Sequence, residues 1–227
     1  LFALLRHALR SFAVPRFTPL AFAAALLWLV HPLQTAAVTC VVQRAESLMA
    51  LCFLLTLYTF ARGTIRRHTS DDSIFPASWW LAFSIVACLA GMACKEVMVV
   101  APLVVLLFDR TFAAGSFVAA LRARSIYYGA LAATWLLLAW LVVRNASRAG
   151  TAGFDGDIAW TDYALTQFVA IATYLKLSLW PQSLVFDYGT AVEQELSAVW
   201  LHALLIVALG TTTVIALRRQ PKLGFLG

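Results

Sequence analysis

The sequence predicts an all-α fold: a polytopic transmembrane helical bundle of about six spans, with one further helix that is re-entrant or lies on the outer face. Of the 227 residues, 62% are hydrophobic and 12% are charged, and the mean hydropathy is +0.84. Soluble domains carry about 25% charged residues, so this composition excludes a soluble domain. The net charge of +6 comes from basic residues scattered between long apolar runs. Such scattering is typical of membrane topology signals and argues against a nucleic-acid partner.

The individual spans follow from length, because a helix needs about 20 apolar residues to cross a hydrocarbon core about 30 Å thick. Residues 163–180 are apolar but are interrupted by Gln167 and Lys176. The first 14 residues, which contain Arg6, His7 and Arg10, are expected to end a preceding helix or to form a short amphipathic helix on the membrane surface. The six predicted spans are residues 17–38, 44–61, 76–94, 97–112, 125–143 and 196–217.

The charges of the connecting loops predict the orientation, because cytoplasmic loops retain Lys and Arg. With six spans, one side holds twelve basic and three acidic residues, and the other holds five basic and eight acidic ones. Residues 62–75 and 113–124 are therefore predicted to face the cytosol, and 144–162 and 181–195 to face outward. If residues 163–180 also crossed, the C-terminal basic cluster would move outside, so we predict that this helix does not cross.

Four charged residues are expected at membrane depth on the outer side. The 12 uncharged residues between Glu96 and Asp109 cover about 18 Å of helix, which draws the Lys95–Glu96 pair inward. The 15 residues between Glu46 and Arg62 cover about 22 Å and have the same effect on Arg44 and Glu46. In one interpretation these groups line a shared outward-facing cavity that binds an anionic ligand, and Glu96 neutralises Lys95 when no ligand is bound. In the other, they form two ion pairs that only hold the helix ends together.

Other candidate residues are fewer. His31 precedes Pro32 at the end of the first span and is a candidate ligand contact, although a proline there also stops a helix. Asp187 and Tyr188 lie in a loop rich in turn formers, where an interfacial aromatic belt is the alternative. The sequence predicts no catalytic constellation and no metal site. The four cysteines have no metal-type spacing and are predicted to be free, packed thiols: Cys40, Cys52, Cys88 and Cys94.

Three ordered strings carry a family resemblance. They are HPLQTAAVTCVVQRAESLMAL at 31–51, CKEVMVVAPLVVLLFD at 94–109 and YLKLSLWPQSLVFDYG at 174–189. In this order and at this spacing they resemble the membrane portion of the transmembrane and tetratricopeptide-repeat O-mannosyltransferase-like proteins. The family usually carries Glu after the Gln-Thr pair, whereas this chain has Ala36, so a role of that carboxylate is lost here.

The resemblance implies a module of a GT-C type membrane glycosyltransferase. Such enzymes take a sugar from a polyprenyl-phosphate carrier and attach it to an acceptor on the exoplasmic face. The resemblance implies mannose, O-linked to a protein acceptor, and places the catalytic carboxylates in a first exoplasmic loop that this sequence lacks. The chain, 1–227, is therefore expected to be a single transmembrane domain from the centre of a longer protein, without its C-terminal repeats. Arg44 or Lys95 would supply a cation to the lipid phosphate.

Two other functions remain open at this point: a lipid-binding transporter, and a non-catalytic membrane anchor or scaffold for a repeat domain. The expected partners are membrane lipid, a polyprenyl-phosphate sugar as substrate and a protein acceptor. No cofactor is expected. The Ala- and Arg-rich composition favours a bacterial inner membrane, with the endoplasmic reticulum as the eukaryotic alternative.

Overall fold

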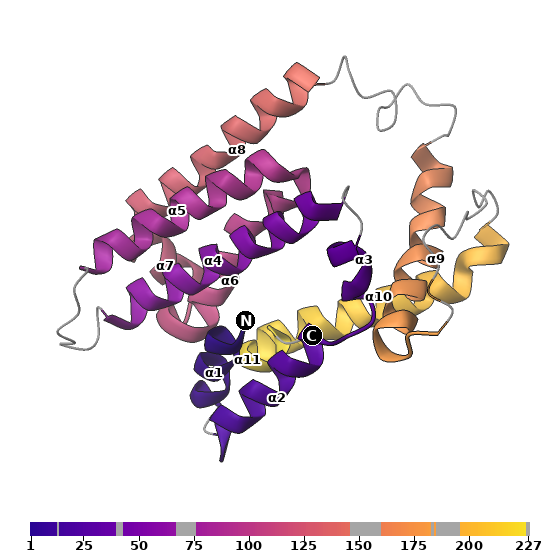
Figure 1. The fold of residues 1–227 in the computed structure, drawn as a ribbon, viewed down its shortest axis with the longest axis horizontal. Helices are drawn as coiled ribbons and strands as arrows, with labels where there is room; N and C mark the ends of the chain where they lie inside the picture. The colour runs from indigo at the N-terminus through magenta and orange to yellow at the C-terminus, as the bar shows by residue number, and fades with distance from the viewer. Residues whose placement is uncertain are drawn as a thin grey trace. The chain divides into compact units, whose positions relative to one another are not determined.

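The structure is a computed structural model and describes residues 1–12, 14–39, 43–66, 76–145, 160–182, 184 and 196–225. Within these ranges the regular structure is entirely helical, which confirms the predicted all-α class (Figure 1). The chain divides into two compact units, residues 1–143 and 144–227. The assignment of the whole chain to one transmembrane domain stays a prediction.

The first unit begins with three shorter helices, α1 (Phe2–Ser11), α2 (Phe17–Leu29) and α3 (Gln34–Thr39). Two long helices follow, α4 (Arg44–Arg66) and α5 (Ala77–Cys94). A 3-10 segment, η2 (Glu96–Val100), leads into α6 (Ala101–Asp109) and a π-type turn, η3 (Arg110–Ala114). The last elements are α7 (Phe117–Ala123) and α8 (Ser125–Asn145). The second unit contains α9 (Trp160–Leu179), α10 (Leu196–Arg219) and α11 (Pro221–Gly224).

Helices α4 and α5 form a closely packed antiparallel hairpin (Figure 1). A Cβ atom added to Gly63 would lie 3.2 Å from both the Ala77 carbonyl oxygen and the Leu81 side chain. At the other end of α5, a Cβ on Gly91 would lie 2.7 Å from Met98 Sδ. Small residues that let helices approach in this way are typical of membrane bundles, where van der Waals packing is a main source of helix association.

A buried polar cluster joins α8 to this hairpin. The Ser84 hydroxyl donates to the Thr56 carbonyl oxygen at 2.8 Å and lies 2.8 Å from the Tyr127 hydroxyl. The Tyr127 ring stacks on the ring of Phe60, with 5.3 Å between centroids. Because lipid cannot hydrogen-bond to these groups, their partners must come from neighbouring helices. The cluster therefore fixes α4, α5 and α8 to one another.

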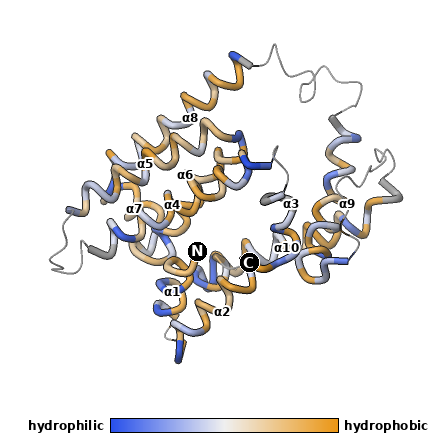
Figure 2. Tube along the Cα trace, viewed as in Figure 1, coloured by the Kyte–Doolittle hydropathy of each residue, from blue (hydrophilic) through white to orange (hydrophobic). Residues whose placement is uncertain are grey.

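Five helical segments of the described chain are long and apolar enough to cross a membrane. They are Arg44–Thr64, Ala77–Cys94, Glu96–Ala114, Ser125–Arg144 and Val199–Arg219. Figure 2 shows that their middle parts are hydrophobic and that hydrophilic residues gather near their ends. These segments match five of the six predicted spans and define a multi-pass membrane protein.

The first predicted span, 17–38, is wrong as a continuous helix. Helix α2 ends at Leu29 after 13 residues, about 20 Å, and α3 begins only at Gln34. Between them Pro32 cannot donate a backbone hydrogen bond and disfavours helical geometry at His31. The His31 ring stabilises the resulting turn, because its Nδ1 accepts the Leu33 N–H at 3.3 Å.

Helix α9 covers the region whose crossing was in question. It is 20 residues long, begins at Trp160 and ends at Leu179. It contains Asp162 in its first turn and Lys176 in its last. It is not among the five segments that combine sufficient length with sufficient apolarity. That it stays on one side of the membrane remains a prediction.

Candidate functional site

The candidate site lies at the end of the hairpin where α4 begins and α5 ends. There the Lys95 ammonium forms an ion pair with the Glu46 carboxylate. The two side chains are 35% and 40% exposed, so the pair is accessible to a ligand. Sequence analysis placed both residues at one membrane depth, and the structure brings them into direct contact.

The local backbone explains why Lys95 reaches across to α4. Lys95 ends α5 in an extended conformation, with φ −161° and ψ 146°, before η2 starts at Glu96. This break in the helix separates the side chains of neighbouring Lys95 and Glu96, and Glu96 is exposed. The expectation that Glu96 neutralises Lys95 is therefore corrected, because Glu46 occupies that place.

The other predicted site residues are placed less closely. Arg44 is exposed in the first turn of α4, two residues before Glu46. His31 lies in the turn between α2 and α3, where its ring nitrogen already accepts a backbone hydrogen bond. Asp187 and Tyr188 lie outside the described residues. The roles of Asp187 and Tyr188 as ligand contacts thus stay predictions.

A second ion pair, missed by sequence analysis, is fully buried in the same unit. Arg124 Nη1 donates to both Asp109 carboxylate oxygens at 2.8 Å, and the Tyr128 hydroxyl donates to Asp109 Oδ2 at 2.7 Å. The exposed fractions of the Asp109 and Arg124 side chains are 0% and 7%. The useful signal was an aspartate at the end of an apolar span followed by an arginine at the start of the next one.

The two ion pairs lie toward opposite ends of α4. Glu46 is in its first turn, whereas the Arg124 guanidinium carbon lies 5.9 Å from the centroid of the Phe60 ring. The 14 residues from Glu46 to Phe60 correspond to about 21 Å along the helix. The two ion pairs are therefore well separated along α4.

The two pairs differ in what they can do chemically. The buried Asp109 carboxylate already accepts three hydrogen bonds and has a structural role. Separating it from Arg124 would leave an uncompensated buried charge. The half-exposed Lys95 can exchange one anionic partner for another at little desolvation cost. Within the described ranges, no three His, Cys, Asp or Glu side chains gather as a metal site would require. An ammonium group that can exchange its partner is suited to binding an anion.

Fold and site together define a multi-pass helical membrane protein with a half-exposed ion pair at one end of its central hairpin. Over 183 residues, 78% of its length, the chain is 31% identical to the Drosophila melanogaster protein O-mannosyl-transferase Tmtc2. It is also 40% identical over 90 residues, 38% of its length, to Tmtc3 of the same organism, and 37% identical over 73 residues, 32% of its length, to human TMTC4. These matches confirm the predicted resemblance to the transmembrane and tetratricopeptide-repeat O-mannosyltransferase-like family.

The similarity covers only a small part of each relative's length. The chain spans 19% of Tmtc2, and the matches to Tmtc3 and TMTC4 cover 9% and 10% of those proteins. No protein-family model matches the chain, and no solved structure matches it. The relatives named here are animal proteins, so they give no support to the expected bacterial inner membrane.

Proposed function

We propose that the chain is a membrane module of a glycosyltransferase that binds a polyprenyl-phosphate-linked sugar and takes part in its transfer to a protein acceptor on the exoplasmic face. The transferred sugar is mannose, and the linkage is through oxygen. The observation that carries this proposal is the similarity, over 78% of the chain, to a protein named as a protein O-mannosyl-transferase. The multi-pass helical fold supports it, because a lipid-linked donor must be bound within or beside the membrane.

In this proposal Lys95 is the residue that holds the donor phosphate. Without donor, the ammonium is neutralised by Glu46. When donor binds, the phosphate takes the place of the Glu46 carboxylate. As the bond between sugar and phosphate breaks, negative charge grows on the phosphate oxygens, and a fixed cation stabilises the transition state in which that charge develops. Lys95 and Arg44 are binding residues in this scheme, and the general base would come from another part of the complete protein.

The proposal is tested by the binding of mannosyl-phosphoryl polyprenol to the complete protein purified in detergent. Lys95→Ala should weaken binding about tenfold or more, because a charge-assisted contact to phosphate contributes about 1.5 to 3 kcal/mol. Lys95→Arg should restore binding in part, since the guanidinium keeps the charge but differs in shape and hydration. Arg44→Ala should also weaken binding if this exposed arginine contacts the same phosphate.

The matched control is Lys176→Ala, which removes an exposed lysine from α9. Its donor affinity should equal that of the unmodified protein. The melting temperature of each variant separates loss of binding from loss of folding. Unchanged donor affinity in both Lys95→Ala and Arg44→Ala would refute the assignment and return the Glu46–Lys95 pair to a structural role at the helix ends.

A further inference from the structure

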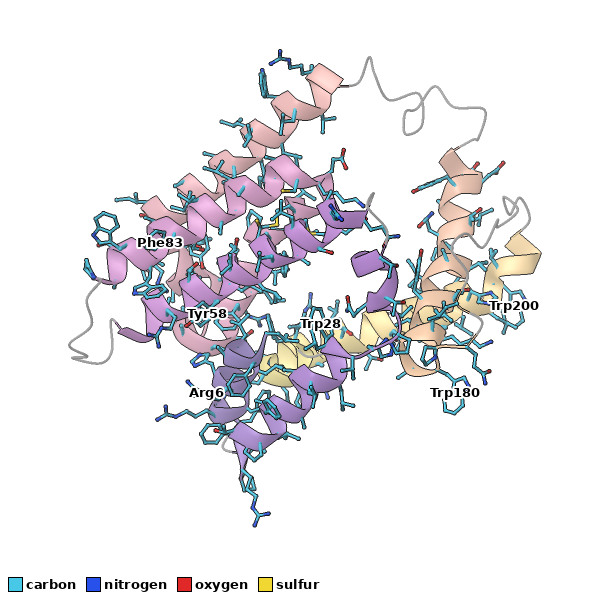
Figure 3. The ribbon with its side chains drawn as sticks, in the orientation of Figure 1. Arg6, Trp28, Tyr58, Phe83, Trp180 and Trp200 are labelled. Carbon is cyan, nitrogen blue, oxygen red and sulfur yellow. The ribbon has the colours of Figure 1, made fainter. Side chains whose placement is uncertain are left out.

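A surface rich in arginine lies at the end of the first unit opposite the Glu46–Lys95 pair. We call it the basic end and define it by four exposed arginines that three short or peripheral elements contribute: Arg6 and Arg10 of α1, Arg16 at the start of α2, and Arg122 of α7. Figure 3 shows the Arg6 side chain extending from α1 away from the neighbouring helices.

Contacts with the bundle hold α1 at this end. The centroid of the His7 ring lies 6.0 Å from that of Phe108 and 6.2 Å from that of Phe112, where α6 gives way to η3. Ala8 is buried, and α1 packs against both α2 and α4. The arginines of α1 are therefore presented by a docked helix, which limits the conformational entropy lost when they bind a partner.

Helix α7 combines exposed charge with exposed apolar area. Phe117, Val118 and Leu121 are 43%, 58% and 43% exposed, and Arg122 is exposed beside them. The helix begins at a Ser116 cap, whose hydroxyl accepts the Ala119 N–H at 3.1 Å. A short helix with both apolar and cationic side chains exposed is typical of the interface between lipid headgroups and acyl chains.

The basic end has no exposed carboxylate of its own among the described residues of α1, α2, α6, η3 and α7. In these elements the single acidic residue is Asp109, which is fully buried and already paired with Arg124. The exposed arginines must therefore find their counter-charges outside this part of the chain. Because Arg122 lies beside the exposed apolar side chains of α7, a soluble polyanion would satisfy the charge but would leave this face of α7 uncovered.

We propose that the basic end binds the headgroups of anionic glycerophospholipids, with the arginines of α1 and α7 contacting phosphate and the apolar side chains of α7 contacting the upper acyl chains. Each basic residue close to an anionic membrane surface strengthens binding roughly fivefold at low salt. The interaction is electrostatic in origin, so it weakens as ionic strength rises. It is independent of the donor site at Lys95.

The experiment compares the binding of phosphatidylglycerol and phosphatidylcholine to the full chain in neutral detergent micelles, followed as the shift in melting temperature during lipid titration. The unmodified chain should bind phosphatidylglycerol more tightly. The variant Arg6→Gln/Arg122→Gln should bind it roughly 30-fold more weakly. Arg6→Lys/Arg122→Lys keeps both charges and should keep most of the affinity.

The control variant Arg144→Gln/Lys176→Gln removes two exposed cations that lie outside the basic end. It should bind phosphatidylglycerol as the unmodified chain does. An equal loss of affinity in both Gln variants, or no loss in Arg6→Gln/Arg122→Gln, would overturn the proposal. Stabilisation by inorganic phosphate alone, to the extent seen with phosphatidylglycerol, would overturn the assignment to a lipid.

Discussion

Replacing Arg124 by Ala should be among the most damaging single substitutions in the first unit. The change removes both hydrogen bonds from Arg124 to Asp109 and leaves the carboxylate, which is 0% exposed, with only the Tyr128 hydroxyl as a partner. Breaking a buried ion pair in this way costs about 3 to 5 kcal/mol of folding free energy. The lower value is the better expectation for a membrane protein, because its unfolded state in micelles also finds partners for polar groups.

The measurement is the free energy of unfolding of the full chain in mixed micelles, for four proteins that form a double-mutant cycle. Asp109→Leu and Arg124→Met should each be strongly destabilising, whereas the double variant should lie close to the unmodified chain, because no buried charge remains. Arg122→Ala is the matched control: this arginine lies two residues earlier and is exposed, so its loss should change stability by less than about 0.5 kcal/mol. A coupling energy below about 0.5 kcal/mol would refute the reasoning.

Three further predictions concern packing, pH and topology. Gly91→Ala should destabilise the packing of η2 against α5 by about 1 to 3 kcal/mol, because its Cβ would lie 2.7 Å from the Met98 side chain. Replacing Met98 by Ala in the same chain should recover the part of this loss that comes from strain, as thermal unfolding would show. Burial and the charge of Arg10 lower the pKa of His7, so the folded state favours the neutral ring, and docking of α1 should weaken as pH falls below about 6.5. Hydrogen exchange of α1 should show this pH dependence and lose it in His7→Phe. Cysteines introduced for accessibility labelling should be reached from outside at Thr151→Cys but not at Arg66→Cys, and the opposite pattern would reverse the predicted orientation.

Much of the fold could be predicted from the sequence because apolar run length is a direct physical requirement for crossing a bilayer. The predicted span at 76–94 agrees with α5 within one residue, and that at 125–143 agrees with α8 within two. The span at 17–38 was wrong because hydropathy alone does not register the backbone restriction at Pro32. Pro32, which sequence analysis already noted as a helix stop, was the signal to end the helix before it.

The candidate site was predictable only in part. Helix length and the need to satisfy buried charges placed Glu46 and Lys95 at the same membrane depth. Their pairing was not predictable, because it depends on the extended backbone of Lys95 and on the packing of α4 against α5. The Asp109–Arg124 pair was missed for a related reason. Asp109 ends α6 and Arg124 follows α7, so the π-type turn and α7 separate the two residues in the sequence.

The antiparallel arrangement of α4 and α5 also gives the Glu46–Lys95 pair an electrical polarity. Glu46 lies in the first turn of α4, at the positive end of that helix's dipole. Lys95 lies at the end of α5, at the negative end of the α5 dipole. Each charge therefore stands in a favourable backbone field of about 0.3 to 1 kcal/mol in addition to its attraction to the other. Exchanging the two residues would preserve the ion pair but place each charge against the wrong helix terminus. The same field would favour any anion that takes the place of Glu46 beside Lys95, because the positive end of the α4 dipole lies there.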